Sequence, residues 1–130
     1  MIAVIVPTIR EEKLKEFLNA WDFLFKKHKV ALYIVRDGEK PTVNQFTVEG
    51  VMGEYKDLIY NFNDGVRNLG FAQAYKDGAD IFISLDDDVL PDGDTIQDHL
   101  DVLKTRKEIS YMNSVDDIYM RGFPYWAREE

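Results

Sequence analysis

Short apolar runs that alternate with a helical pattern place the strongest constraint on how this chain can fold. Ile2–Val6, Ala31–Val35 and Ile81–Leu85 are continuous apolar runs, which are typical of strands buried on both faces of a sheet. Between the first two, apolar residues recur at intervals of three and four from Leu14 to Phe25, which predicts a helix of about four turns. This alternation predicts an α/β fold with a mostly parallel sheet between two layers of helices.

Weaker signals assign the remaining segments. Gln45–Val51 alternates weakly and predicts an edge strand, and Tyr55–Tyr60 predicts another short strand. A helix is expected over Val66–Lys76, closed by an Asp-Gly pair. A further helix is expected around Ile96–Leu103, followed by a strand at Ile109–Met112.

Polar residues follow all three apolar runs, at the sheet edge where ligands bind in folds of this kind. Pro7 is expected to end the first strand and leads into Thr8-Ile9-Arg10, while Arg36-Asp37-Gly38 follows the second strand and Asp86-Asp87-Asp88 the third. A polar residue after a strand often only begins a loop, and Asp-Gly is an ordinary turn signal. The aspartate triplet is a stronger indication of a functional site than either of these features.

Three adjacent carboxylates repel one another and cost stability unless they are solvated or bridged by a cation. Alternate residues of an extended segment share a face, so Asp86 and Asp88 are expected to converge while Asp87 points elsewhere. Oxygen ligands suit Mg²⁺ or Mn²⁺, which take one or two carboxylates together with water and substrate phosphates. We therefore predict a divalent metal at Asp86 and Asp88; a solvated acidic loop is the alternative.

The charge distribution also bears on the ligand. The formal net charge is −8, and nine aspartates fall between Asp77 and Asp101. An acidic cluster repels phosphate unless a cation intervenes, and the same excess argues against nucleic-acid binding. Arg67, expected in the first turn of the second helix, is a candidate phosphate ligand because a cation there is otherwise unfavourable. An exposed arginine is the alternative.

Length and composition fit one globular domain over residues 1–130. The chain is 45% hydrophobic, which is enough to build a core. No stretch approaches the roughly 20 apolar residues of a membrane span, and no basic leader precedes the first apolar run. The absence of cysteine excludes disulfides, thiolate zinc sites and cysteine nucleophiles. A cytoplasmic protein is the expectation.

The segment Tyr119–Arg128 combines four aromatic residues with two arginines, Arg121 and Arg128. Aromatic rings stack on a base or a sugar, and guanidinium groups are well shaped to bind phosphate. A segment that only packs onto the core is the alternative.

Four blocks of sequence carry a resemblance: Val4–Arg10, Tyr33–Gly38, Ile81–Asp88 and Met120–Glu129. Together they resemble the GT-A nucleotide-diphospho-sugar transferase fold, which is Rossmann-like. More narrowly, the chain is similar to the reversibly glycosylated polypeptide family, known for UDP-arabinopyranose mutase activity. The first three blocks fit many GT-A proteins, whereas the last, Arg-Gly-aromatic-Pro-aromatic followed by Arg-Glu, is more specific. Family members are much longer, so the fold is expected to be incomplete at its C-terminus.

The resemblance implies roles by position. It implies a UDP-sugar site formed by Pro7, Thr8, Arg10, Asp37, Arg67 and Asp87. Within that site Asp37 would contact the uracil or ribose, and Arg67 would meet the pyrophosphate. The family's metal-binding roles fall on Asp86 and Asp88, where Mn²⁺ or Mg²⁺ would stabilise the UDP leaving group.

The expected function is a metal-dependent nucleotide-sugar enzyme in which Arg121 carries the sugar reversibly and Arg128 is the second essential arginine. The tail motif favours a mutase that interconverts pyranose and furanose rings; the abundance of GT-A transferases favours a glycosyltransferase. The C-terminal half that longer family members have is missing here, which supports a non-catalytic binding module or a self-glycosylated carrier for polysaccharide synthesis. A homo- or hetero-oligomer is also expected as a possible assembly. A phosphotransfer receiver domain is the remaining alternative. It is disfavoured because that fold needs an acidic pair at the end of the first strand, where this chain has Pro7-Thr8.

Overall fold

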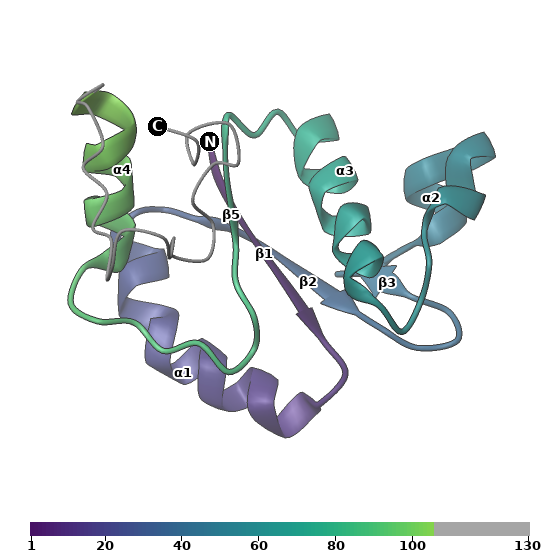
Figure 1. Cartoon of the computed structure of the whole chain (residues 1–130), viewed down its shortest axis with the longest axis horizontal. Coiled ribbons are helices and arrows are strands. Elements are labelled where there is room, and N and C mark those ends of the chain that lie inside the picture. The colour runs from purple at the N-terminus through teal and green to yellow at the C-terminus, as the bar shows by residue number, and fades with distance from the viewer. Residues whose placement is uncertain (106–130) are drawn as a thin grey trace, which may run out of the picture. The chain divides into compact units, whose positions relative to one another are not determined.

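The computed structural model describes residues 1–105, and its contacts divide the chain into two units, Met1–Ile96 and Gln97–Glu130. The elements in chain order are β1 (Ile2–Thr8), α1 (Glu11–Lys27), β2 (Ala31–Arg36), β3 (Thr42–Val43), β4 (Phe46–Thr47), α2 (Val48–Met52), the 3-10 helices η1 (Gly53–Leu58) and η2 (Asp64–Arg67), α3 (Asn68–Lys76), β5 (Ile81–Ser84) and α4 (Thr95–Thr105) (Figure 1). The strand predicted at Ile109–Met112 lies outside the described residues. The expectation of one domain stays a prediction.

A mixed sheet forms the centre of the first unit, and in the described residues it has five strands in the order β4-β3-β2-β1-β5. β1 pairs in parallel with both β2 and β5, whereas β3 and β4 add an antiparallel hairpin beside β2. The α/β prediction is confirmed, but the sheet is mixed rather than mostly parallel. The cause is local: only short turns join β2 to β3 and β3 to β4, and short turns can join only antiparallel strands.

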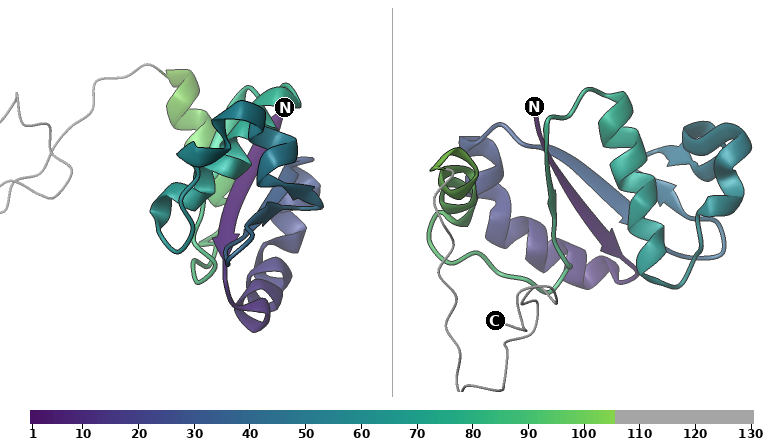
Figure 2. Two further views of the ribbon diagram at one scale, coloured as in Figure 1. Left: turned by 90° about the vertical axis from the view of Figure 1, so that its right-hand side faces the viewer. Right: turned by 45° about the horizontal axis from the view of Figure 1, so that its top comes forward.

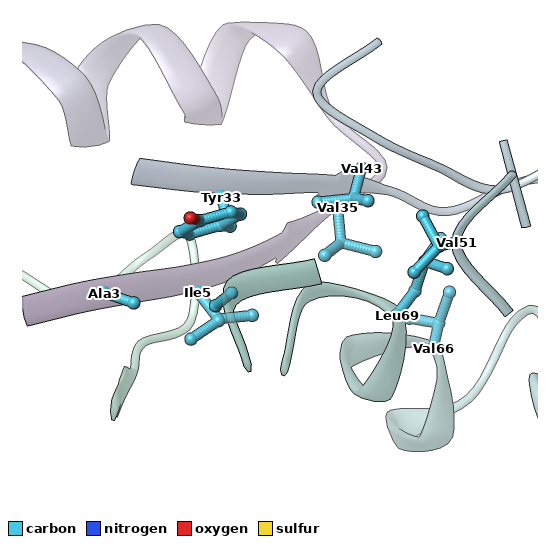
Figure 3. Close-up of a cluster of buried hydrophobic side chains, with 9 residues drawn as sticks. Ala3, Ile5, Tyr33, Val35, Val43, Val51, Val66 and Leu69 are labelled. Atoms are coloured by element: carbon cyan, nitrogen blue, oxygen red, sulfur yellow. The ribbon is translucent and has the colours of Figure 1, made fainter. Parts of the chain in front are cut away.

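Helices α1 and α3 lie on opposite faces of the parallel strands (Figure 2). Ala3 and Ile5 of β1 belong to a buried cluster with Leu69 of α3 (Figure 3). The alternate residues Val4 and Val6 are also fully buried, and by the pleat of a strand they face the other side, toward α1. The central strand is therefore covered on both faces, as its unbroken apolar run predicts.

The predicted helices are present. α1 spans Glu11–Lys27, with acidic residues in its first turn and basic residues in its last, in the sense that the helix dipole favours. The helix predicted over Val66–Lys76 is α3, preceded by η2 and followed by Gly78 at a positive φ of 89°. Over the described part of the chain, no helix has the length and apolarity needed to cross a bilayer.

β1 continues through Pro7, contrary to the expectation that this proline ends the strand. Ile5 O accepts a hydrogen bond from the amide of Leu85, and Thr8 O accepts one from the amide of Asp37. The backbone N–H and C=O groups of the odd residues of β1 therefore point toward β5, and those of the even residues point toward β2. The N–H that Pro7 lacks would point beyond the end of β5, where no ladder bond is lost.

Two further expectations about strands are wrong. The run Ile81–Leu85 was expected to be buried, but in the described sheet β5 is an edge strand paired only with β1, and Phe82 is 36% exposed. The edge strand predicted at Gln45–Val51 is confirmed only over Phe46–Thr47, which is β4 at the edge of the described sheet, whereas the strand predicted at Tyr55–Tyr60 is wrong. The Thr47 hydroxyl accepts a hydrogen bond from the amide of Gly50 at 3.1 Å and so caps α2, after which the chain continues into η1.

Gly70 allows α3 to pack closely against the sheet. A Cβ atom at this position would lie 2.6 Å from Cγ2 of Ile5 and 2.8 Å from Cγ2 of Val35. We predict that Gly70→Ala lowers the free energy of unfolding by about 1–3 kcal/mol through overpacking, measured by urea denaturation. Tyr75→Ala, at a 76% exposed position of the same helix, is the control and should change stability by less than about 0.5 kcal/mol. Equal effects of the two substitutions would contradict this packing.

Tyr33 of β2 is buried and donates a hydrogen bond to Asp77 at 2.8 Å. Burial, together with the hydrogen bond to Asp77 and its negative charge, raises the pKa of Tyr33 to about 12. The unfolded chain loses this proton near pH 10, so the unfolding free energy should fall as pH rises from about 10 to 12. Tyr33→Phe should remove this slope and cost about 1 kcal/mol at pH 7. Denaturation at several pH values tests this, with the exposed Tyr75→Phe as control; an unchanged slope in Tyr33→Phe would oppose it.

Candidate functional site

The carboxyl ends of β1, β2 and β5 meet at one edge of the sheet, around a pocket of about 490 Å³. β2 and β5 flank β1 on opposite sides, and the connections from β1 to β2 and from β2 to β5 carry α1 and α3 on opposite faces. The strand order therefore reverses at β1, and ligands of open α/β sheets bind at such a reversal. The volume lies in the range of small-molecule sites.

The pocket brings together all the predicted site residues that the structure describes. These are Pro7, Thr8, Arg10, Asp37, Arg67, Asp86, Asp87 and Asp88. Arg121 and Arg128 lie outside the described residues. The sequence interpretation missed Phe62, Asn63 and Asp64, which also line the pocket. Asn63-Asp64-Gly65 directly precedes the helix predicted from Val66, and the chain that leads into a helix of an α/β fold often lies at the sheet edge where ligands bind.

Asp87 joins the loop after β5 to the loop after β1. It is buried, with one carboxylate oxygen accepting from the Thr8 hydroxyl at 2.8 Å and the other from Arg10 Nη2 at 3.0 Å. Asp87 therefore positions Thr8 and Arg10 at the edge of the pocket, which it also lines. The implied contact of Asp87 with a nucleotide sugar stays a prediction.

Arg67 occupies the junction between η2 and α3 and reaches across to the end of β5. Its guanidinium donates to Ser84 Oγ at 2.7 Å and to Asp86 Oδ1 at 2.9 Å, and it lies 3.9 Å from Asp64. The Arg67 side chain is 26% exposed, so the alternative of a freely exposed arginine is wrong. A guanidinium held at a strand-end pocket is suited to bind phosphate.

Asp86 and Asp88 are exposed while Asp87 is buried. Asp87 and Asp88 lie in a turn, in which the Val89 amide donates to Asp86 O at 3.3 Å, and not in an extended segment. That Asp86 and Asp88 converge on one ligand stays a prediction. Among the residues that the structure describes, no group of three His, Cys, Asp or Glu could hold a metal ion. These residues therefore do not form a closed cage. They suit an ion such as Mg²⁺ that takes one or two carboxylates and completes its shell with water and ligand phosphates. Asp86 would then be shared between the ion and Arg67.

The described lining of the pocket carries two arginines and five aspartates, a formal excess of three negative charges. Such a surface repels an anionic ligand unless a cation enters with it. A phosphorylated ligand would therefore bind here as its metal complex, oriented with its phosphates toward Arg67.

Asp37 holds a neighbouring loop in place. Its Oδ1 atom accepts hydrogen bonds from the amides of Gly38 and Phe62, both at 2.8 Å. Asn61 donates from Nδ2 to Gly38 O at 3.0 Å, so two hydrogen bonds join the loop at Asn61–Phe62 to the turn after β2.

Comparisons of the chain with protein-family models, with curated proteins and with solved structures find no match.

Neighbouring aspartates offer a direct test of the role of Asp87. Asp87→Ala should lower the free energy of unfolding by about 1–3 kcal/mol, because the buried Thr8 hydroxyl and Arg10 lose their acceptor. Asp88→Ala removes the same charge at an exposed position and should change stability by no more than about 0.5 kcal/mol. Urea denaturation of both variants at one pH and ionic strength makes the comparison. Equal losses would show that the triplet acts only as a solvated acidic loop.

Proposed function

We propose that this chain binds a nucleoside diphosphate sugar, with UDP-sugar as the first candidate, at the carboxyl edge of β1, β2 and β5. One observation carries the proposal: residues selected from the sequence for this chemistry, from Pro7 to Asp88, line a single pocket of about 490 Å³. They come from three separate strand ends and from the junction of η2 with α3, so chain proximity alone does not account for their convergence.

The diphosphate is assigned to the β5 side of the pocket. Arg67 supplies a guanidinium there, and Asp86 and Asp88 are the exposed carboxylates that would hold Mn²⁺ or Mg²⁺. When bound, the ion would neutralise charge on the diphosphate and stabilise a UDP leaving group. Arg10, whose guanidinium donates to Asp87 at 3.0 Å, places a second positive charge on the β1 side of the pocket.

The finer fold assignment belongs to the same proposal. We assign the chain to a three-layer, Rossmann-like GT-A sheet. The strand order β2-β1-β5 supports this assignment, as do helices on both faces of β1.

Sugar transfer, by mutase or glycosyltransferase chemistry, is assigned to Arg121 and Arg128 on the tail motif alone. The binding proposal does not depend on it. A non-catalytic binding module or glycosylated carrier is the second candidate, and one observation favours it. Thr8 has the only hydroxyl among the described pocket residues, and it donates to Asp87; the described pocket therefore offers no free hydroxyl to carry a sugar, which favours a binding module over a glycosylated carrier.

The test is calorimetric titration of the full chain with UDP, in Mn²⁺ and in chelator. Wild type should bind UDP at least tenfold more tightly with Mn²⁺. The double variant Asp86→Asn with Asp88→Asn should lose most of this metal-dependent gain, because the ion loses both carboxylates. Asp92→Asn with Asp98→Asn removes the same charge from exposed positions outside the pocket and should bind like wild type.

The sign of the effect separates two explanations. If Asp86 and Asp88 only repel phosphate, neutralising them should strengthen UDP binding in chelator and leave no metal-dependent loss. Wild-type binding that is equal with and without Mn²⁺ would refute the metal assignment. Absence of UDP binding under both conditions would refute the proposed function.

A further inference from the structure

Phe62 is an aromatic residue held in an unusual backbone conformation on the wall of the pocket. Its φ is 56°, in the left-handed region that bulky residues rarely adopt. The residue lines the pocket and remains 60% exposed. The conformation therefore does not serve to bury the ring in the core. Strained residues held at a ligand site commonly belong to its function.

The surrounding hydrogen bonds hold this conformation. Asp37 Oδ1 accepts from the Phe62 amide at 2.8 Å and from the Gly38 amide at the same distance. Asn61, directly before Phe62, donates to Gly38 O at 3.0 Å. The end of β2 thus fixes the backbone of Phe62, and with it the point from which the aromatic side chain extends.

The pocket has chemically different ends. Asp37, with its partner Phe62, follows β2, whereas Asp86 and its partner Arg67 lie at the end of β5. β1 lies between these two strands, so the ends are separated by two inter-strand spacings, about 10 Å. A nucleoside diphosphate likewise carries a flat aromatic base at one end and its phosphates at the other. With the diphosphate at Arg67, the base falls on the side of Phe62.

We propose that Phe62 stacks on the base of the bound nucleotide and that Asp37 is a positioning residue acting through the Phe62 backbone. This inference rests on the proposed function and refines it. The resemblance implies direct contact between Asp37 and uracil or ribose; the positioning role is separate from such a contact, because it uses Oδ1, which accepts from the Gly38 and Phe62 amides. Because stacking accepts any aromatic base, Phe62 contributes affinity without selecting uracil.

The experiment compares two probes, UDP and inorganic pyrophosphate, each titrated calorimetrically into the full chain with Mn²⁺. Phe62→Leu should weaken UDP binding roughly 5- to 100-fold, the range typical of losing one stacked base. It should leave pyrophosphate binding within twofold, because only UDP carries a ring. Tyr60→Leu is the matched control: Tyr60 is 64% exposed, lies two residues away and does not line the pocket. It should bind both probes like wild type.

Two further variants address geometry. Phe62→Trp adds a third tryptophan to Trp21 and Trp126, and UDP should quench the fluorescence of this variant more than that of wild type, whereas pyrophosphate should not. Asp37→Asn keeps an oxygen that can accept from the Phe62 and Gly38 amides, so its affinity for UDP should be within a few-fold of that of wild type. Asp37→Ala lacks this oxygen and should lose as much UDP affinity as Phe62→Leu. Circular dichroism and melting curves check that each variant is folded.

The outcomes distinguish this inference from the proposed function. If Phe62→Leu and wild type bind Mn²⁺–UDP equally, or if Phe62→Trp shows no UDP-specific quenching, the stacking role is overturned and the nucleotide site stands. If Asp37→Asn loses as much affinity as Asp37→Ala, the positioning role of Asp37 is overturned. If wild type binds neither probe, both the inference and the proposed function fail.

Discussion

The pairing of β1 with two parallel neighbours is the constraint on which the rest of the structure depends. Residues Ala3–Val6 are fully buried, and their hydrogen-bonding groups alternate between β5 and β2. With every backbone group of this segment directed at a neighbouring strand, neither register can slip without exposing polar groups in the core. The two registers place the residues after β2 and after β5 on either side of Thr8.

This arrangement explains why the edge of the sheet forms a site. β1 continues past the end of β5, so Thr8 and Arg10 lie beside the aspartate triplet, and Asp87 accepts from both. On the other side, Asp37 donates its amide to Thr8 O and holds Phe62 through its carboxylate. Three loops that lie far apart in sequence are thus joined by side chains at strand ends, around one pocket.

The sequence predicts what depends on local periodicity and fails where distant neighbours decide. The existence of α1, β1 and β2 follows from apolar spacing. The edge position of β5 does not follow from the sequence, because its apolar run looks like that of a central strand. The Asp87–Arg10 ion pair depends on a register across 77 residues. Nothing in the sequence signals a left-handed Phe62, since phenylalanine rarely adopts that conformation.

The excess negative charge of the pocket is less uniform than its five aspartates suggest. Asp37 is held by two backbone amides, Asp87 is neutralised by Arg10, and Asp86 is paired with Arg67. Asp88 has no ion pair or hydrogen bond within the described residues. Asp64, 3.9 Å from Arg67, shares that guanidinium with Asp86. Two of the three excess negative charges of the described lining therefore lie beside Arg67, and the third is on Asp37. A metal–diphosphate complex would supply the missing positive charge to Asp88 and a second partner to Arg67, so an acidic pocket can bind an anionic ligand at this end.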